Sequence, residues 1–331
     1  MPRSANIVIH PSQFPESVRR DLVESLRTRK VNHKFHYDSF RQARKWLALH
    51  QAYSPSRRDA GGMSLYDRGF EAAARRMKAR RIHVLGLGCG GGRKDTRLLT
   101  LLKAGGRDVS YGPCDVSAAM VLVARQAALH VVSERKCFPL VCDLASAEDL
   151  RAAFERNGPP RTPRVLTFFG MIPNFEPDAI VSKLAALVRR QDLLLAGANL
   201  APGRDYAAGM KQVLPQYNNA LTREWLMTFL LDLGVGRRDG RLLFRIEDDP
   251  AGSRLKRVAA HFQFSRASGI RVDEERFGFR RGDSIRLFYS YRHTPERMEA
   301  LLGRHGLRVL DRWIAPSGEE GVFLAARRLY N

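Results

Sequence analysis

The sequence predicts an α/β fold in which a doubly wound, mostly parallel sheet forms the core. Within residues 81–95 an apolar run breaks into glycines and then into a helical pattern. Two further apolar runs end in acidic residues, Asp115 and Asp143, and the chain closes with two strand patterns joined by a short turn. Strand patterns that alternate with helical patterns are typical of a parallel sheet with helices on both faces.

The first predicted strand leads into a glycine-rich turn. Its apolar, β-branched character at Ile82 and Val84 is typical of a strand that is buried on both faces. Gly86, Gly88 and Gly90 permit positive φ values and a close backbone approach, so they are candidate cofactor contacts. The N-terminus of the helix that follows would direct unpaired N–H groups at a phosphate or a carboxylate. The alternative is a glycine-rich loop that binds no ligand.

Acidic residues end the second and third predicted strands. Residues 109–115 form the second strand, and an acidic residue at its carboxyl end, Asp115, would accept hydrogen bonds from ribose hydroxyls. Residues 138–143 form a short third strand, which places Asp143 and Leu144 beside an adenine edge. The alternative for Asp115 is that it caps the helix that follows.

The fourth predicted strand, residues 164–170, runs into a proline-containing turn that ends at residue 177. The crevice outside the carboxyl ends of parallel strands is where a substrate meets a cofactor. Asn174 offers an amide donor and an acceptor at this position, so it is a candidate substrate ligand. A helix that begins near Pro177 then leads to a fifth strand at residues 193–196.

The end of the chain predicts a helix and then a hairpin. Thr294 and Pro295 have the residue types of an N-cap and a first helical position. Two strands follow, at residues 307–313 and 322–326, joined by a turn that contains Pro-Ser-Gly. A closing antiparallel hairpin after five parallel strands favours a Rossmann-like sheet of the class I methyltransferase type over a nicotinamide dehydrogenase.

Residues 1–60 carry a helical pattern that is interrupted by an aromatic group at residues 35–38. Aromatic residues mostly pack in cores, and Tyr37 is consistent with that. Residues 53–57 have the composition of a turn. Tyr53 is therefore either a surface residue of this turn or a hydroxyl that faces a pocket.

Composition limits the class of protein. The 331 residues predict about two domains. The net charge of +22 suggests nucleic acid as a partner, but the Lys and Arg residues are spread along the chain, which is typical of a solvated surface. The four cysteines lack a CxxC spacing, so we expect reduced thiols, no metal site and a cytoplasmic location. No apolar run is long enough to span a membrane, and we expect a monomer without a membrane partner.

Several motifs together resemble the histidine Nα-methyltransferase family of ergothioneine biosynthesis, whose members depend on S-adenosylmethionine. The similarity covers most of the chain. It lies in residues 34–38, 53–57, 88–94, 96–99, 115–117 and 174–177 and, more loosely, in residues 217–219.

The resemblance implies a site residue by residue. The residues that would contact the cofactor are Gly88, Gly90, Lys94, Asp115 and Asp143. The residues that would bind the amino and carboxylate groups of the substrate are Tyr53, Asn174 and Tyr217. The resemblance also implies a discontinuous methyltransferase core at residues 61–200 and 291–331, with residues 1–60 and 201–290 forming a smaller substrate-binding lobe.

One motif departs from the family pattern. The family's Thr-Glu-x-Ser-x-Lys-Tyr motif, whose Glu and Ser recognise the imidazole ring, corresponds to residues 287–293, where Phe288 replaces the Glu and Ser290 is kept. A charged hydrogen bond from that Glu contributes on the order of 1.5 to 3 kcal/mol, and a phenyl ring cannot replace it. We therefore expect an α-amino acid other than histidine, or a derivative, with an aromatic or anionic side chain that contacts Phe288 and Arg257.

The implied reaction is attack of a neutral α-amine on the methyl group of the cofactor. Orientation rather than a strong base would accelerate it, with Asn174 and Tyr37 as the catalytic candidates beside the nitrogen. Two alternatives stay open. One is a nucleic-acid methyltransferase that uses the basic surface, although no Asn-Pro-Pro-Tyr motif follows the fourth strand; the other is an inactive cofactor-binding protein.

Overall fold

The computed structural model describes residues 5–53 and 62–328, and the chain divides into two compact units. Unit 1 comprises Met1–Gln13, Pro55–Leu200 and Thr294–Asn331, and unit 2 comprises Phe14–Ser54 and Ala201–His293. The sequence assigned residues 1–60 to the lobe and residues 291–293 to the core. The first residues instead belong to unit 1, because β1 (Val8–Ile9) pairs with its sheet, and 291–293 belong to unit 2, where β11 (Ser284–Arg292) ends.

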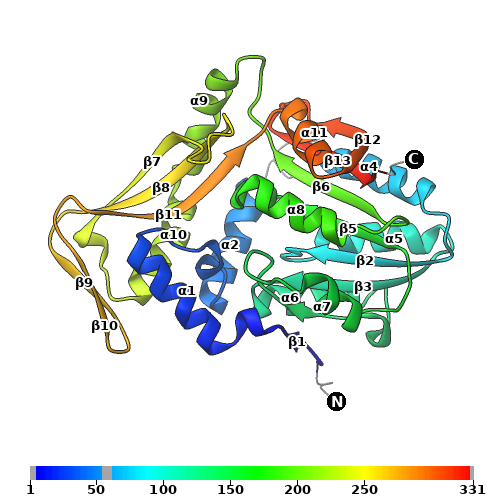
Figure 1. The fold of residues 1–331 in the computed structure, drawn as a ribbon, viewed down its shortest axis with the longest axis horizontal. Coiled ribbons are helices and arrows are strands. Elements are labelled where there is room, and N and C mark those ends of the chain that lie inside the picture. The colour runs from blue at the N-terminus through cyan, green and yellow to red at the C-terminus, as the bar shows by residue number, and fades with distance from the viewer. Residues whose placement is uncertain (1–4, 54–61, 329–331) are drawn as a thin grey trace. The chain divides into compact units, whose positions relative to one another are not determined.

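Unit 1 is built on an eight-stranded sheet with the strand order β1-β4-β3-β2-β5-β6-β13-β12 (Figure 1). Its longer members are β2 (Arg81–Leu87), β3 (Asp108–Asp115), β5 (Arg164–Phe169), β6 (Leu193–Asn199), β12 (Leu307–Ile314) and β13 (Glu320–Arg327). Neighbouring strands are parallel, except that β13 is antiparallel to both β6 and β12. The predicted Rossmann-like sheet with a closing antiparallel hairpin is confirmed.

Helices cover both faces of this sheet. They are α4 (Gly62–Arg76), α5 (Arg93–Ala104), α6 (Ala118–Ala128), α7 (Leu150–Arg156), α8 (Pro177–Leu187) and α11 (Pro295–Arg304), with short 3-10 turns η1 (Pro11–Gln13), η3 (Glu134–Lys136) and η4 (Ile172–Asn174). One apolar cluster packs α4, α5 and α6 on the sheet, and a second packs α7, α8 and α11. The predicted cap at Thr294 is confirmed, because its side chain accepts the Arg297 N–H at the start of α11.

The third strand is shorter than predicted. The strand β4 contains only Leu140–Val141, whereas the sequence suggested residues 138–143. Phe138 N–H still donates to Tyr111 O (2.8 Å) and Cys142 N–H to Asp115 O (2.9 Å). Pro139 between them has no N–H, so it cannot extend a regular ladder.

Unit 2 combines helices with antiparallel strands. Its helices are α1 (Pro15–Thr28), α2 (Phe40–Tyr53), α9 (Tyr206–Tyr217) and α10 (Ala220–Asp232), with the 3-10 turns η2 (His33–His36) and η5 (Arg237–Asp239). Its other strands are β7 (Gly240–Asp248), β8 (Lys256–Phe264), β9 (Ser268–Val272) and β10 (Glu275–Phe279). The strands form a sheet of order β11-β8-β7 and a separate β9–β10 hairpin. The sequence interpretation named no strands here, because charged side chains such as Arg241 and Arg245 interrupt the apolar pattern of β7.

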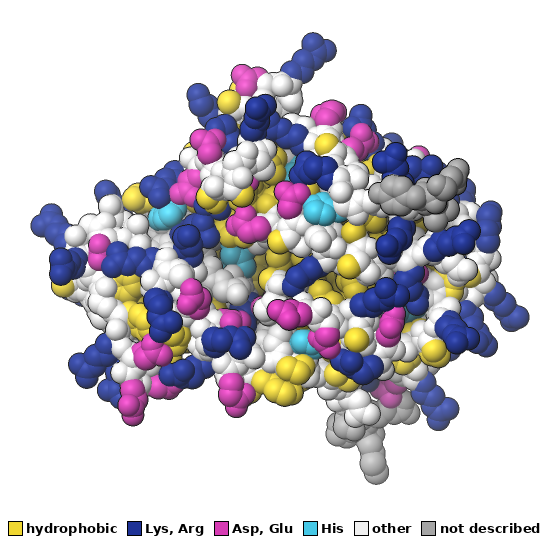
Figure 2. All heavy atoms as spheres, viewed as in Figure 1, with side chains coloured by type: hydrophobic (Ala, Val, Ile, Leu, Met, Phe, Trp, Pro, Cys, Tyr) yellow, Lys and Arg dark blue, Asp and Glu magenta, His cyan; other side chains and the backbone are white. Residues whose placement is uncertain are grey.

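In the described part of the chain, none of the helices has the length and the apolar character that crossing a membrane requires. On the face shown in Figure 2, Lys and Arg side chains are scattered, with acidic side chains between them. The positive charge is thus not gathered into one stripe on this face.

Candidate active site

The glycine turn lies directly after β2, at the carboxyl end of the parallel strands. Gly88, Gly90 and Gly92 have φ values of 63°, 50° and 67°, which L side chains rarely adopt. A Cβ atom on Gly88 would lie 2.6 Å from Cγ of Met171, in the segment that follows β5. The turn therefore requires glycine at position 88 for two reasons, its backbone conformation and its close approach to Met171.

Gly86 has a different reason to be glycine. It lies within β2, and a Cβ atom there would lie 2.2 Å from Oδ2 of Asp95. Asp95 is buried and accepts hydrogen bonds from the hydroxyls of Tyr111 (2.7 Å) and Thr167 (2.7 Å). Burial raises the pKa of Asp95 to about 6. Gly86 makes room for this carboxyl group, and its contact with a cofactor stays a prediction.

Sequence reasoning did not single out Asp95. A signal was present, because Asp95 lies three and four residues before Leu98 and Leu99, on the apolar face of α5. An acidic residue on such a face needs hydrogen-bond donors from neighbouring elements, and β3 and β5 supply them.

Asp115 ends β3 beside the glycine turn. Its Oδ2 accepts the Gly90 N–H (3.0 Å) and its Oδ1 accepts the Ser117 N–H (3.0 Å). Burial raises the pKa of this carboxyl group to about 6. The side chain that caps α6 is that of Ser117, which accepts the Met120 N–H, so the alternative role of Asp115 as the N-cap is wrong.

Asp143 follows β4 and is supported from the N-terminal segment of the chain. Its N–H donates to Oγ of Ser12 (3.0 Å), and its Oδ1 accepts the Ala145 N–H (2.9 Å). Ser12 in turn contacts Nδ1 of His10 (2.9 Å). Leu144, the other predicted adenine contact, is buried next to Asp143. Sequence reasoning missed Ser12 and His10, since their partners lie about 130 residues away in the chain.

Lys94 lies in the first turn of α5, and its ammonium group faces two buried side chains. Its Nζ lies 3.6 Å from Oε1 of Glu320 and 3.7 Å from the ring centroid of Tyr66. Tyr66 also donates its hydroxyl to Oε1 of Glu320. The predicted cofactor ligand Lys94 thus belongs to a cluster whose other members sequence reasoning did not single out.

Asn174 ends the short turn η4 after β5. Its N–H donates to Met171 O (2.9 Å), and its half-buried side chain makes no hydrogen bond to the described residues. The amide group is therefore available to a ligand at the carboxyl edge of the sheet, where the sequence predicted it.

Unit 2 brings three predicted substrate residues together. Phe288 and Ser290 lie two residues apart on β11 and share one face of the strand. Tyr217, the last residue of α9, donates its hydroxyl to Oγ of Ser290 (2.9 Å), and its ring centroid lies 6.2 Å from that of Phe288. Arg292, the next residue on this face, donates its Nε–H to the Tyr217 hydroxyl (3.1 Å). Arg292 was missed, although it continues the two-residue strand period.

Phe288 is enclosed by aromatic side chains of unit 2 and is 7% exposed. The ring of His33 stacks on it with a centroid separation of 5.1 Å, and Trp225 contacts it edge-on at 5.6 Å. His33 Nε2 accepts the Tyr289 N–H (3.2 Å), and burial lowers the pKa of His33 well below its ordinary value. His33 is therefore neutral at pH 7, and little of Phe288 remains for a substrate contact.

Arg257 does not lie beside Phe288, so the expectation that both contact one substrate side chain is wrong. Arg257 pairs in register with Tyr291, one position away from Ser290, and therefore lies on the opposite face of the sheet. Its guanidinium group donates to Glu247 (3.2 Å) and to the Tyr291 hydroxyl (3.3 Å). Arg257 is a packing residue of that face.

The two remaining predicted tyrosines lie on or next to α2 in unit 2. Tyr37 is half-buried, with its ring centroid 5.5 Å from Trp225 and 5.8 Å from Trp46. Tyr53 is the last residue of α2 and is 37% exposed. The turn was predicted at residues 53–57; its residues 54–57 lie outside the described part of the chain, so the role of Tyr53 stays a prediction.

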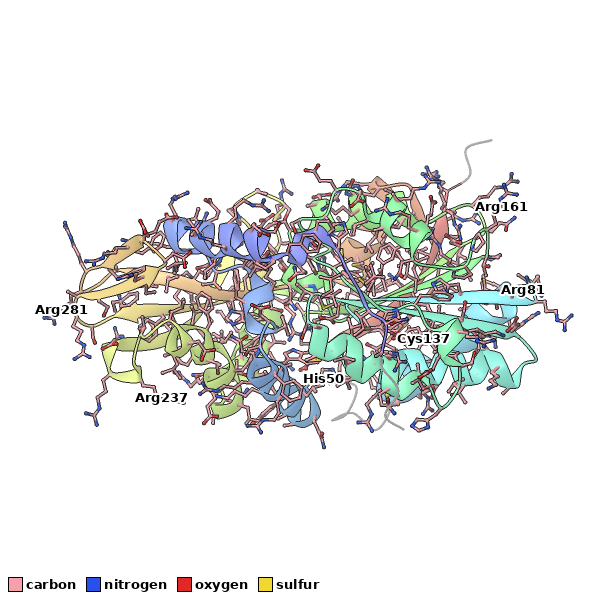
Figure 3. The ribbon with its side chains drawn as sticks, turned by 90° about the horizontal axis from the view of Figure 1, so that it is seen from below. His50, Arg81, Cys137, Arg161, Arg237 and Arg281 are labelled. Atoms are coloured by element: carbon pink, nitrogen blue, oxygen red, sulfur yellow. The ribbon has the colours of Figure 1, made fainter. Side chains whose placement is uncertain are left out.

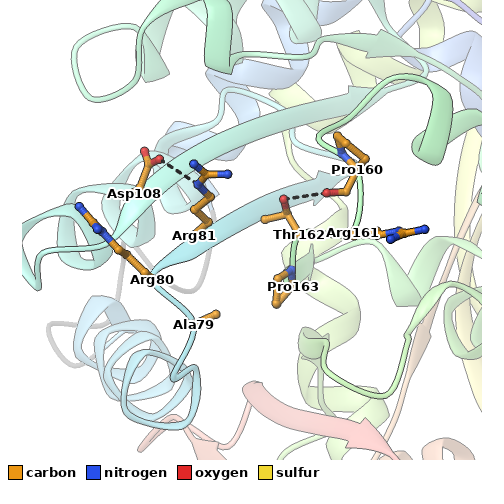
Figure 4. A pocket seen from close by; sticks show the side chains of 8 residues that line it. All are labelled: Ala79, Arg80, Arg81, Asp108, Pro160, Arg161, Thr162 and Pro163. Carbon is orange, nitrogen blue, oxygen red and sulfur yellow. Dashed lines mark hydrogen bonds and ion pairs between the residues drawn. The ribbon is translucent and has the colours of Figure 1, made fainter.

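A pocket of about 580 Å³ lies at the opposite edge of the unit 1 sheet, where β2 and β3 begin (Figure 4). Arg81 and Arg161 lie at this end of unit 1 (Figure 3), but Arg80 and Arg161 point away from one another in the close view. Asp108 in its lining forms an ion pair with Lys136. The positive groups do not converge on one ligand, and ligands of such sheets bind at the carboxyl ends of the strands.

Among the residues that the structure describes, no group of three or more His, Cys, Asp or Glu side chains is placed to hold a metal ion. The four cysteines are free thiols, and burial raises the pKa of Cys137 to about 11.

Comparisons with known proteins add a family and several weak structural similarities. A family model for histidine-specific, S-adenosylmethionine-dependent methyltransferases matches residues 18–327. No curated protein matches the sequence significantly.

Three solved structures illustrate the structural similarity. The 1,6-didemethyltoxoflavin-N1-methyltransferase of Burkholderia thailandensis is 12% identical, with 99% of this chain and 94% of that chain covered and a TM-score of 0.42. Magnesium protoporphyrin IX methyltransferase of Synechocystis PCC 6803 is 14% identical, with 94% and 98% covered and a TM-score of 0.43. The CcbJ methyltransferase of Streptomyces caelestis is 14% identical, with 80% and 89% covered and a TM-score of 0.40. Similarity at this level says nothing about the substrate.

Proposed function

This chain belongs to the family of histidine-specific, S-adenosylmethionine-dependent methyltransferases, and we propose that it methylates the α-amine of an amino acid or amino-acid derivative other than histidine. It is a methyltransferase, and its cofactor is S-adenosylmethionine. The observation that carries the proposed substrate is the group of Tyr217, Ser290 and Phe288 on one face of unit 2, in which the carboxylate expected for imidazole recognition is replaced by a phenyl ring.

The residues of unit 1 fit the cofactor. Gly88 keeps open a space that a Cβ atom would fill, and the turn precedes a helix N-terminus. The carboxylate of Asp115 accepts the backbone N–H groups of Gly90 and Ser117, and it has further lone-pair sites that could accept a ribose hydroxyl. Asp143 and Leu144 would contact the adenine. The bound cofactor supplies an electrophilic methyl group on its sulfonium sulfur.

The chain's own task in the reaction is to orient an amine and to keep water out. A neutral amine carries its own lone pair, so the attack needs no strong base, and correct placement accounts for most of the acceleration. The amide oxygen of Asn174 would accept a hydrogen of the amine. Tyr37 lies in unit 2 and Asn174 in unit 1, and their joint role beside the nitrogen stays a prediction.

The side-chain preference follows from charge. The family resemblance places a Glu where Phe288 stands, and Arg292 brings a positive charge next to Tyr217 and Ser290. Without the carboxylate, an imidazolium would be repelled by the guanidinium group, and a neutral imidazole would lose a charged hydrogen bond. A neutral aromatic or an anionic side chain avoids both costs.

Product analysis tests the proposal. The protein is incubated with methyl-deuterated S-adenosylmethionine and a pool of α-amino acids, and labelled products are identified by mass spectrometry. We expect labelled N-methyl amino acids other than histidine derivatives, and Phe288→Glu should move the preference towards histidine. Tyr289→Phe, on the opposite face of β11, is the matched control and should leave the preference unchanged. Histidine as the preferred wild-type substrate would refute the proposal.

Two alternatives give different outcomes in the same assay. A nucleic-acid methyltransferase would label added RNA or DNA and no amino acid, with a strong dependence on salt. An inactive protein would bind S-adenosylhomocysteine and label nothing.

A further inference from the structure

Glu320 is a buried carboxylate at the carboxyl edge of the unit 1 sheet. It is the first residue of β13, it pairs in register with Asn199 at the end of β6, and it is 4% exposed. Its Oε1 accepts the Tyr66 hydroxyl and lies 3.6 Å from Nζ of Lys94. Its Oε2 is buried and has no hydrogen-bond partner among the residues that the structure describes. A buried oxygen left in this state costs free energy, so a donor that reaches it would be bound favourably.

The surroundings of Glu320 are built to hold it in place. The ring of Tyr66 meets Phe169, the last residue of β5, edge-on at 5.1 Å. A Cβ atom on Gly197 would lie 3.2 Å from the Tyr66 hydroxyl, so glycine there leaves room for that group. Burial and the charge of Glu320 raise the pKa of Tyr66 well above its ordinary value, and the hydroxyl therefore stays a donor to Glu320.

The cluster lies next to the predicted cofactor loop. Lys94 is the second residue of α5, the helix that begins directly after Gly92. The ammonium group of Lys94 and the carboxylate of Glu320, 3.6 Å apart, offer charges opposite to the carboxylate and the ammonium group of an α-amino acid. The amino-acid end of S-adenosylmethionine is such a zwitterion.

We propose that Lys94 and Glu320 together form the subsite for the amino-acid end of the cofactor. Lys94, which the family resemblance places among the cofactor contacts, pairs with the carboxylate of the cofactor, and Oε2 of Glu320 accepts a hydrogen bond from its α-ammonium group. Tyr66 is a positioning residue that orients Glu320. The inference rests on the cofactor assignment and not on the identity of the methylated substrate.

Binding measured by calorimetry on the full chain tests this subsite. S-adenosylhomocysteine carries the amino-acid end, whereas 5′-methylthioadenosine lacks it. We expect Glu320→Gln to weaken S-adenosylhomocysteine by about 10- to 100-fold, which corresponds to one charged hydrogen bond, and to leave methylthioadenosine within about threefold of the wild type. Equal weakening of both ligands would mean that Glu320 only supports the fold, and an unchanged affinity for S-adenosylhomocysteine would also overturn the proposal.

A second measurement needs no variant, in case Glu320→Gln does not fold. An analogue of S-adenosylhomocysteine without its α-amino group should bind the wild-type protein at least about 10-fold more weakly than S-adenosylhomocysteine. Equal binding of the two compounds would refute a role for Glu320. If neither S-adenosylhomocysteine nor methylthioadenosine binds, the cofactor assignment itself fails and the subsite falls with it.

Discussion

Replacing Gly88 by alanine tests whether the glycine turn holds the cofactor. Two separate costs are expected. Gly88 has a φ of 63°, and an alanine in this left-handed region costs about 1 to 2 kcal/mol. The new Cβ atom would also lie 2.6 Å from Cγ of Met171, so the Met171 side chain has to move. Met171 lies in the segment that leads to Asn174, so its displacement should disturb the ligand site.

Gly106→Ala is the matched control, because it has the first cost without the second. Gly106 has a φ of 75°, and a Cβ atom there would meet no atom within 4 Å. Gly106→Ala should therefore lose about 1 to 2 kcal/mol of unfolding free energy in urea, and Gly88→Ala should lose at least as much. Only Gly88→Ala should also weaken the binding of S-adenosylhomocysteine, by at least about 10-fold.

The assay combines urea unfolding with calorimetric titration of S-adenosylhomocysteine. Because both variants carry the same backbone cost, the difference between their affinities reports the local effect of the Cβ atom at position 88. If Gly88→Ala and Gly106→Ala both bind the ligand as tightly as the wild type, the assignment of this turn to the cofactor is wrong.

Three further predictions concern unit 1. Burial raises the pKa of Asp115 to about 6, and ribose hydroxyls donate best to the ionised carboxylate. The affinity for S-adenosylhomocysteine should therefore fall as the pH is lowered from about 7 to 5. Calorimetry of Asp115→Asn should show weaker binding without this pH dependence. Ser12→Ala removes the acceptor of the Asp143 N–H, and we expect a loss of about 1 to 3 kcal/mol in urea and a weaker ligand affinity, which an unchanged titration would contradict. Asp192→Asn breaks a buried pair with Arg164 (2.7 Å) and should cost about 3 to 5 kcal/mol in urea at pH 7. Burial acts to raise the pKa of Asp192, but hydrogen bonds from Arg189 and the charge of Arg164 outweigh burial and lower this pKa in the folded protein. The stabilisation is therefore present at pH values above the ordinary pKa of an aspartate and is lost as the pH falls through the lowered pKa. Equal unfolding midpoints for variant and wild type at pH 7 would refute this role of Asp192.

Much of unit 1 was accessible from the sequence, because its signals are local. The buried strands β2, β3, β5 and β6 are short stretches rich in apolar residues, and glycine, proline and threonine mark the ends of the helices. The same local patterns predicted the closing hairpin of β12 and β13, which the structure confirms. Unit 2 was less accessible, since charged residues interrupt its strand patterns and its antiparallel partners are separated by turns of different length.

The sequence alone determined which elements form in unit 1 and which residue types stand at the carboxyl ends of its strands, because backbone preference and apolar period act over a few neighbouring residues. Only the tertiary structure decided which distant groups meet. Ser12 reaches Asp143, Glu320 reaches Lys94, and Arg257 lies on the face opposite Phe288. These outcomes depend on strand register and on which sheet edge a segment joins, and a shift of one residue moves a side chain to the other face.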